Sequence, residues 1–367
     1  MKELAHAARG RAWAFIVLAS VCVTLVDPVL SERVLADSAA ESAPPDVSQV
    51  DALPASVAEV ERTLSILHDK FRGHDDGAVA SHNDVAVAAD PNAFGIAIAT
   101  VDGRVISVGD SKLTFPLQSL SKSFLFGLAL KDNGIEAMLR KVGVYATGFP
   151  YGSLTAMEVR ATKLQNPMVS AGAIAATSTI AGSNSEEKWH RTLRFLQAFA
   201  GRDVKPIREV YDAEMASNNG SLARAWVLSH YDLLYAEPYA AVDHYLHACS
   251  VGVTAEDLAI MGATLANGGV NPKTKERVVS AEIARSQLSA MVTAGMYDHS
   301  GPWLLRVGLP AKSGVSGGVF AIVPNGFAIA VYSPRLDTYG NSVRAFEVIK
   351  DLSERWKLHL LAVAPSQ

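Results

Sequence analysis

Two β-hairpin signals near opposite ends of the chain constrain its fold more than any other feature of the sequence. The first, GIAIATVDGRVISVG at 95–109, turns at Asp102-Gly103, and the second, GGVFAIVPNGFAIAVYSP at 317–334, turns at Asn325-Gly326. Asp-Gly and Asn-Gly between apolar runs favour the tight turns that join antiparallel strands. We therefore expect an antiparallel sheet whose strands come from both ends of the chain.

The segment between the hairpins shows the spacing of apolar residues that is typical of helices. Before the first hairpin, Ser56 is expected to cap a helix whose apolar face begins with Val57 and Val60. The sequence predicts an α+β fold, an α/β sandwich in which terminal helices cover the sheet and a helical subdomain spans about 125–290. The cleft between sheet and helices is the expected site. Further helices are expected at 171–180, 222–234, 255–266, 281–291 and 342–356.

The N-terminus has the pattern of an export signal. Basic residues precede an apolar core at 13–26, and small residues follow, with Ala36 as one cleavage end. This core is too short for a comfortable membrane span. We expect a signal peptide at 1–36, a flexible linker rich in Ala, Ser, Pro and acidic residues at 37–54, and a globular domain at 55–362. The protein is then exported, to the periplasm or beyond, with no stable membrane span; the alternative is retention by an uncleaved N-terminal anchor.

Composition and charge exclude several classes of function. The net charge is −4, and no basic run is long enough to follow a phosphate backbone, so nucleic-acid binding is not expected. The ten histidines lack metal-ligand spacing and no glycine-rich phosphate loop is present, so we expect no metal and no other cofactor. Signal cleavage would remove Cys22 and leave Cys249 alone, which excludes an internal disulfide.

The stretch FPLQSLSKSFLFGLAL at 115–130 places a serine and a lysine at the start of an apolar helix. Residues three apart lie on one helical face, so the side chains of Ser119 and Lys122 are expected to meet. A lysine that burial makes neutral can take the proton of a serine hydroxyl, which predicts a nucleophile and its base. Ser121 faces away and is expected to be a cap or solvated. The same spacing at Ser185 and Lys188 is acidic and indicates a surface helix.

Two further features favour hydrolase chemistry. Lys312-Ser313-Gly314, at the start of a strand, matches the Lys-Thr-Gly element that accompanies Ser-x-x-Lys in β-lactamases and penicillin-binding proteins. The alternative is a glycine-rich strand entry with a surface lysine. Tyr245 and Tyr297 stand in polar contexts, and either could relay a proton to a leaving amine. The alternative for both is a buried tyrosine with a satisfied hydroxyl.

From about Asp90 to Glu354 the chain resembles the serine-dependent glutaminases, which share the β-lactamase-like fold. The resemblance implies hydrolysis of L-glutamine to L-glutamate and ammonia through a serine acyl-enzyme, with a small-molecule substrate, no cofactor, and a homodimer or homotetramer. The matching blocks are DPNAFGIAIATVDGRVISVGD, FPLQSLSKSF, NPMVSAGAIAATS, VYDAE, YLHACSVGVTAEDLAIMGATLANGGVNPKTKERV, AGMYDHSG and VGLPAKSGVSGGVFAIVPN.

The resemblance also implies roles for the residues of the reaction centre. Ser119 attacks the side-chain amide with Lys122 as its base. The backbone N–H groups of Ser119 and Val315 hold the oxyanion. Tyr297 assists proton transfer, while Tyr245 lines the pocket and supports Lys122.

The implied substrate-binding residues include three departures from the family pattern. Glu214 binds the α-ammonium group of the substrate, and Gln118 helps to hold the substrate. His82 stands where the family usually has tyrosine, Ser170 where it usually has asparagine, and Gly220-Ser221 where it usually has Arg-Asn.

These departures leave the substrate open. Each polar group of a substrate that stays unpaired costs roughly 1–3 kcal/mol of binding free energy. Besides a glutaminase, the sequence therefore allows an amidohydrolase with altered amino-acid specificity that takes a larger amide. Two further alternatives are an exported penicillin-recognising serine hydrolase acting on cell-wall amides or β-lactams, and a binding protein that has lost catalysis.

Overall fold

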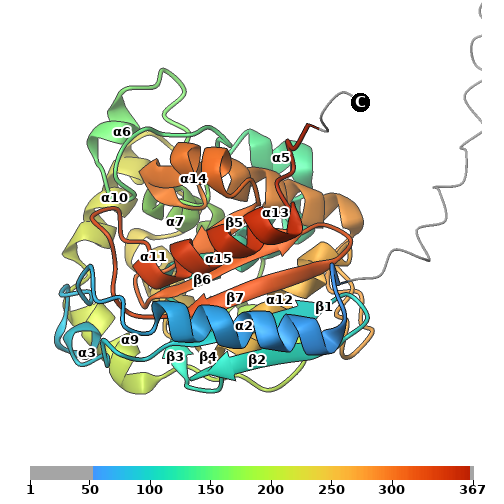
Figure 1. The fold of residues 1–367 in the computed structure, drawn as a ribbon. Coiled ribbons are helices and arrows are strands. Elements are labelled where there is room, and N and C mark those ends of the chain that lie inside the picture. The colour runs from blue at the N-terminus through green and yellow to red at the C-terminus, as the bar shows by residue number, and fades with distance from the viewer. Residues whose placement is uncertain (1–52, 364–367) are drawn as a thin grey trace, which may run out of the picture. The chain divides into compact units, whose positions relative to one another are not determined.

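The computed structural model describes residues 53–363, and its centre is a five-stranded antiparallel sheet (Figure 1). The strand order is β2-β1-β7-β6-β5. Gly95 of β1 lies opposite Tyr332 of β7, so the two hairpins join in one sheet as predicted. The strands are β1 (Gly95–Thr100), β2 (Val105–Gly109), β5 (Ala311–Ser313), β6 (Gly318–Val323) and β7 (Phe327–Tyr332).

Two helices from the ends of the described chain cover one face of the sheet. Figure 1 shows α2 (Val57–Phe71) and α15 (Val343–Trp356) side by side on this face. Ile96 and Ile98 of β1 point toward these helices, while Ala97 and Ala99 belong to the core on the other face. Because both faces are covered, β1 is a continuous apolar run without polar alternation.

Helix α12 (Ala255–Ala266) packs against the opposite face of the sheet. Small side chains allow a close approach: a Cβ on Gly262 would lie 2.7 Å from the Cβ of Ala328. Glycine at this position therefore sets the distance between helix and sheet. Helix α13 (Ala281–Ala294) contacts α12. The chain then forms η2 (Tyr297–His299) and crosses to α14 (Ser300–Arg306), which packs against α15 through Trp303 and Phe346.

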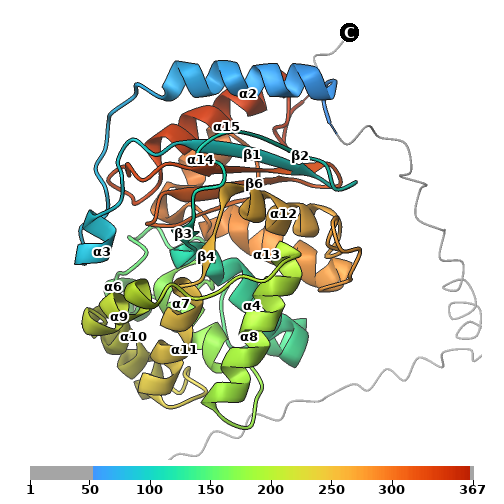
Figure 2. The ribbon, with the colours of Figure 1, turned by 90° about the horizontal axis from the view of Figure 1, so that it is seen from below.

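The remaining helices form a lobe on the α12 side of the sheet (Figure 2). At its centre α4 (Ser121–Asn133) is buried on every side from Ser121 to Leu130, as expected for a helix that is apolar all round. The other elements are α3 (Asp84–Val87), β3 (Phe115–Pro116), η1 (Gln118–Leu120), α5 (Ile135–Leu139), α6 (Thr155–Glu158), α7 (Ser170–Ser178), α8 (Ser185–Ala200), α9 (Arg208–Ala216), α10 (Asn219–His230), α11 (Pro238–Cys249) and β4 (Gly252–Val253).

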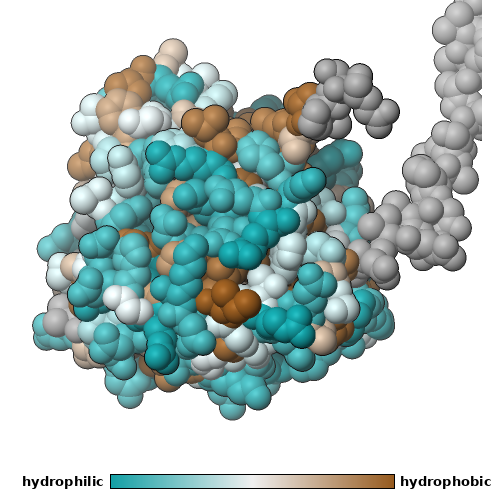
Figure 3. Space-filling model, in the orientation of Figure 1, coloured by the Kyte–Doolittle hydropathy of each residue, from teal (hydrophilic) through white to brown (hydrophobic). Residues whose placement is uncertain are grey.

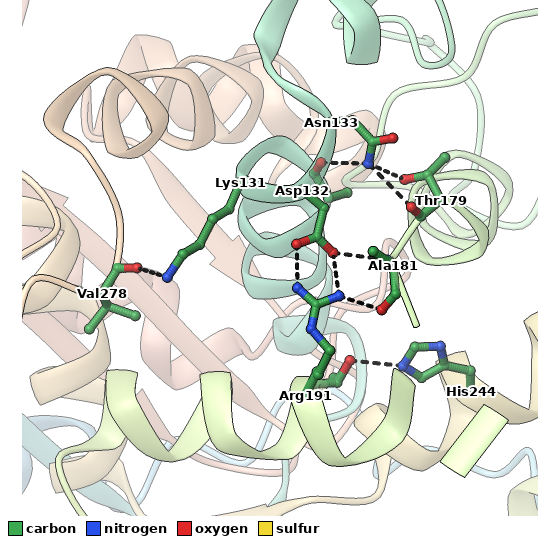
Figure 4. A network of polar contacts seen from close by, with 10 residues as sticks. Lys131, Asp132, Asn133, Thr179, Ala181, Arg191, His244 and Val278 are labelled. Carbon is green, nitrogen blue, oxygen red and sulfur yellow. Dashed lines mark hydrogen bonds and ion pairs between the residues drawn. The ribbon is translucent and has the colours of Figure 1, made fainter. Parts of the chain in front are cut away.

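A polar network fixes the C-terminal end of α4 (Figure 4). Asp132 pairs with Arg191 of α8 at 2.6 Å and accepts the backbone N–H of Ala181 at 2.9 Å. Lys131 donates to the carbonyl of Val278 at 2.9 Å, and the Asn133 amide donates to α4 itself and to the end of α7. Since α4 is anchored at this end and buried along its length, the side chains at its start are held rigidly.

The expected elements are confirmed with small shifts of their ends. Ser56 caps α2, and α12 begins and ends where the sequence predicts. Ser185 begins the surface helix α8, which also confirms the interpretation of Ser185 and Lys188. The outward face of α2 and α15 is mostly hydrophilic (Figure 3).

The N-terminal predictions fall almost wholly outside the described residues. The signal peptide at 1–36 and nearly all of the linker at 37–54 lie there, so the domain boundaries stay predictions. Within residues 53–363, the structure contains no helix that is both long enough and apolar enough to cross a bilayer.

Candidate active site

A short, strained turn presents Ser119 to the cleft. The chain leaves β3, which pairs with β4, and the N–H of Leu117 donates to the carbonyl of Val251 at 2.8 Å. Gln118 then adopts a φ of +47°, a value that residues other than glycine rarely take. Gln118 is the first residue of η1, which runs directly into α4, so Ser119 sits at the start of the buried helix.

Lys122 lies between two hydroxyl groups. Its Nζ donates to Ser119 Oγ and to the phenol oxygen of Tyr245, each at 2.6 Å. Only 1% of Lys122 is exposed, and no carboxylate pairs with it among the described residues. A buried ammonium group without a counter-ion is unstable, so burial lowers the pKa of Lys122 from 10.5 to about 8. A substantial fraction is then neutral near physiological pH and able to accept the serine proton.

Tyr245 stays protonated while Lys122 titrates. Burial raises the pKa of Tyr245 well above 10.0, whereas the pKa of Lys122 is about 8. The lysine is therefore the group of this pair that loses a proton first. Tyr245 can hold the Lys122 amine in place through its hydroxyl without competing for the role of base.

Lys312 is not the surface lysine of the alternative interpretation. It is fully buried, and its Nζ donates to the carbonyls of Gly295 at 3.0 Å and Ser313 at 2.7 Å. Its Nζ also lies 4.0 Å from the ring centre of Tyr297. Burial, and after it the charge of Lys122, hold the pKa of Lys312 well below its usual range. Lys312 thus ties β5 to η2 behind the site and does not line the cleft.

Tyr297 closes the back of the site. The residue is 2% exposed, and its hydroxyl donates to the carbonyl of Ser313 at 3.1 Å beside the Ser119 side chain. Burial raises the pKa of the Tyr297 phenol, although the contact with Ser119 opposes this shift. A protonated hydroxyl next to Ser119 has the geometry needed to pass a proton to a group that leaves from the serine.

These side chains border a cavity of about 220 Å³. The structure brings together at this cavity all of the proposed substrate-binding residues and two of the proposed catalytic ones, while Tyr297 and Lys122 contact Ser119 from outside its lining. The expected residues that line it are His82, Gln118, Ser119, Ser170, Glu214, Ser221, Tyr245 and Val315.

Three hydrogen bonds converge on one oxygen of Glu214. Its Oε1 accepts from His82 Nε2 at 2.7 Å, Asn83 Nδ2 at 2.9 Å and Gln118 Nε2 at 2.9 Å. Burial raises the pKa of Glu214, but these hydrogen bonds outweigh it and lower the pKa below 4.5. The carboxylate is therefore ionised, and within the described part of the chain its Oε2 has no hydrogen-bond partner. Gln118 and His82 therefore hold the Glu214 carboxylate in position through side-chain hydrogen bonds.

Other residues of the site were not found from the sequence. The ring of Tyr151 is tilted against that of Tyr297 with ring centres 4.7 Å apart, and Arg224 of α10 lines the cavity three residues after Ser221. Asn83 reaches Glu214 from a segment more than a hundred residues away in sequence. The helical period would have placed Arg224 on the face of Ser221, whereas no local pattern marks Tyr151 or Asn83.

Residues 53–363 contain no group of three or more His, Cys, Asp or Glu side chains placed to hold a metal ion.

A Ser-x-x-Lys turn and a Lys-Ser-Gly strand beside an antiparallel sheet covered by helices define the architecture of the serine hydrolases with the β-lactamase-like fold. Comparison with known proteins narrows this class. A glutaminase family model matches residues 77–361. The chain belongs to the glutaminase family.

Individual relatives agree with this assignment. A glutaminase of Microcystis aeruginosa is 41% identical over 318 residues, which cover 87% of this chain and 94% of the relative. The solved structure of the probable glutaminase ybaS has a TM-score of 0.82 at 37% identity and covers 84% of this chain and all of that one. Mglu in its glutamate form has a TM-score of 0.78 at 38% identity, covering 83% of this chain and 71% of that one.

Proposed function

We propose that this glutaminase hydrolyses the side-chain amide of L-glutamine to L-glutamate and ammonia through an acyl-enzyme on Ser119, with Lys122 as the base. The observation that carries the proposal is the 2.6 Å contact between the buried, unpaired Lys122 amine and Ser119 Oγ. The amine takes the hydroxyl proton as Oγ attacks the amide carbon. The proton that Lys122 took passes to the departing nitrogen, which leaves as ammonia when the C–N bond breaks. Water then loses a proton to Lys122 as it attacks the ester, and this proton returns to Ser119 Oγ as glutamate leaves.

The oxyanion of each tetrahedral intermediate needs hydrogen-bond donors. Val315 lines the cavity, and among the described residues no acceptor bonds its backbone N–H. Together with the N–H of Ser119, which heads the helical turn, this group is placed to hold the developing charge. Such donors stabilise the transition state most effectively when they are fixed in advance.

The two tyrosines have separate tasks in this mechanism. Tyr297, which lies beside Ser119, assists the transfer of this proton from Lys122 to the departing nitrogen. Tyr245 orients the Lys122 amine through its 2.6 Å hydrogen bond. Both phenols remain protonated in the working range because burial raises the pKa of each.

Glu214 supplies the negative charge that an α-ammonium group requires. Its ionised carboxylate lines the cavity, and Oε1 is held by His82, Asn83 and Gln118. The free Oε2 is left for the substrate. Ser170 and Ser221 line the same cavity and offer hydroxyls to the amino-acid head group in place of the usual asparagine amides.

The test is ammonia release from L-glutamine by the purified protein. A panel of larger γ-amides and a β-lactam acylation probe examines the two alternative substrates. Ammonia release from L-glutamine that is lost when Ser119 is replaced by alanine establishes the proposed reaction. Release only from larger amides, or labelling by the β-lactam without release, would replace L-glutamine with the corresponding substrate.

Glu214→Gln should raise KM for L-glutamine by roughly 10- to 100-fold and change kcat much less. A neutral amide keeps the size of the side chain but cannot pair with the ammonium group, and charge-assisted hydrogen bonds are the strong ones. Steady-state ammonia release gives both constants. Glu282→Gln, an exposed carboxylate on α13, is the control. A fall in kcat with unchanged KM would contradict ground-state binding by Glu214.

The activity should rise with pH and level off above about 8, the pKa of Lys122. Below this value the lysine is protonated and cannot accept the serine proton, so kcat/KM should fall about tenfold for each unit of pH. The measurement is kcat/KM for L-glutamine across this range. A profile that declines as pH rises through 8 would show that the charged lysine is the active form.

We also propose that the protein is exported through its signal at 1–36 and works as a homodimer or homotetramer. The basic residues, apolar core and small residues of the N-terminus support the first point, and the family resemblance supports the second. Mass spectrometry of the mature N-terminus and light scattering of the purified protein test the two points separately.

A further inference from the structure

The substrate cavity contains a guanidinium group that no element of the mechanism uses. Arg224 lines the cavity together with Ser119, Ser170 and Glu214. Its Nε donates to the carbonyl of Gly152 at 3.0 Å, which fixes the plane of the group. Within residues 53–363 this is the sole hydrogen bond of the side chain, and no carboxylate lies within ion-pair distance.

Two glycines shape the space around the guanidinium. A Cβ on Gly152 would lie 2.5 Å from Nη2, and a Cβ on Gly220 would lie 3.4 Å from Nη1. Gly220 and Arg224 both belong to α10 and stand four residues apart. Residues four apart lie on the same face of a helix, one turn along.

The charges that face Arg224 leave its own charge uncompensated. Tyr151 and Tyr245 interact electrostatically with Arg224, but burial raises the pKa of both phenols, so neither is an anion at neutral pH. Lys122 has a charge of the same sign when it is protonated, so it cannot compensate the charge of Arg224. Glu214 is the one carboxylate in the described lining, and it forms no ion pair with Arg224.

We propose that Arg224 binds the α-carboxylate of the amino-acid substrate and so determines specificity for a zwitterionic head group. Glu214 then takes the ammonium and Arg224 the carboxylate, each with a charge of the opposite sign inside one cavity. A guanidinium offers paired N–H donors that match a carboxylate, which no serine hydroxyl can do. Ser170 and Ser221 line the same cavity as Arg224.

This proposal rests on the proposed function, and it predicts a substrate-dependent defect. The comparison uses L-glutamine and 4-aminobutanamide, which keeps the amine and the terminal amide but lacks the α-carboxylate. In Arg224→Gln we expect kcat/KM for L-glutamine to fall roughly 100-fold, mainly through KM, with 4-aminobutanamide changed less than about twofold. Arg224→Lys should lower kcat/KM for L-glutamine less than Arg224→Gln does, because lysine keeps the positive charge but lacks the paired N–H donors of the guanidinium.

The ratio of the two substrates separates carboxylate binding from other effects of Arg224. Its charge lowers the pKa of Lys122, so any variant also shifts the base, but that shift acts on both substrates alike. Equal losses for both substrates, or no loss for L-glutamine, would overturn the proposal. Arg140→Gln, an exposed arginine after α5, controls for a general loss of surface charge.

Gly152→Ala tests the same placement without removing the charge. The new Cβ would meet Nη2 at 2.5 Å, and because this is the end of a flexible side chain, the guanidinium should move while the fold remains. We expect at least a tenfold rise in KM for L-glutamine, with 4-aminobutanamide unaffected. An unchanged KM, or equal losses for both substrates, would contradict the proposal even if Arg224→Gln failed to fold.

Failure of the proposed function would be visible separately. A protein that releases no ammonia from L-glutamine refutes the reaction, yet Arg224 can still be tested by binding. Calorimetry on the Ser119→Ala background would compare L-glutamate with 4-aminobutanoate, which lacks the α-carboxylate. A preference for L-glutamate that Arg224→Gln removes supports the inference, and an unchanged preference refutes it.

Discussion

Ser119→Ala is expected to lower kcat for L-glutamine by roughly 10⁴-fold or more, because Ser119 is the one serine in the described lining whose hydroxyl bonds the Lys122 amine. Ser119 is the serine that contacts both the Lys122 amine and the Tyr297 hydroxyl. Loss of one Oγ atom removes the covalent route but leaves the cavity and the Glu214 carboxylate in place. Binding of L-glutamate should therefore persist while ammonia release disappears.

Ser123→Ala provides a matched control on the same helix. Ser123 is fully buried, one residue after Lys122, and its hydroxyl makes only a weak contact with the sulfur of Met168 at 3.6 Å. Its removal should change kcat less than about tenfold. If the Ser119→Ala protein retained activity comparable to that of this control, Ser119 could not be the nucleophile.

The architecture could be predicted because its strongest signals are local. Two dipeptide turns fix both hairpins, and Ser56 marks the start of the helix that covers them. The pairing of β1 with β7 joins the hairpins from opposite ends of the chain, and the apolar character of both faces made one covered sheet the natural arrangement. The serine and lysine followed from helical geometry in the same way, since three residues make nearly one turn.

What the sequence could not supply are contacts between distant segments. Asn83 donates to Glu214, which lies 131 residues away in sequence, and the guanidinium of Arg224 donates to the carbonyl of Gly152, 72 residues away. Ser121 was also misplaced by local reasoning. It is neither a cap nor solvated: its buried hydroxyl donates to the carbonyl of Gln118 at 2.7 Å, because α4 is covered on all sides.

Lys122→Met and Lys122→Arg should both lower kcat by roughly 10³-fold or more, for different reasons. Methionine has no amine. Arginine keeps the positive charge and the donors but stays protonated throughout the accessible pH range, so it cannot act as a base. The pair distinguishes a neutral base from a fixed charge: if Lys122 only stabilised the oxyanion, the arginine variant would keep much of the activity. The rise of activity toward pH 8 should be absent from both variants.

Lys122→Met should also raise the free energy of unfolding, so a measurement of stability separates loss of function from loss of fold. Burial lowers the pKa of Lys122 from 10.5 to about 8, and this difference corresponds to about 3 kcal/mol of destabilisation at pH 7. Between these two values the unfolded chain binds more protons, so wild-type stability rises with pH there, and Lys122→Met should lack that slope. Its lost hydrogen bonds to Ser119 and Tyr245 offset part of the gain, leaving an increase below about 3 kcal/mol in denaturant unfolding at pH 7. If Lys122→Met is inactive and less stable, Lys122 supports the fold. If it is inactive and more stable, the buried lysine lowers the stability of this glutaminase while serving as its catalytic base.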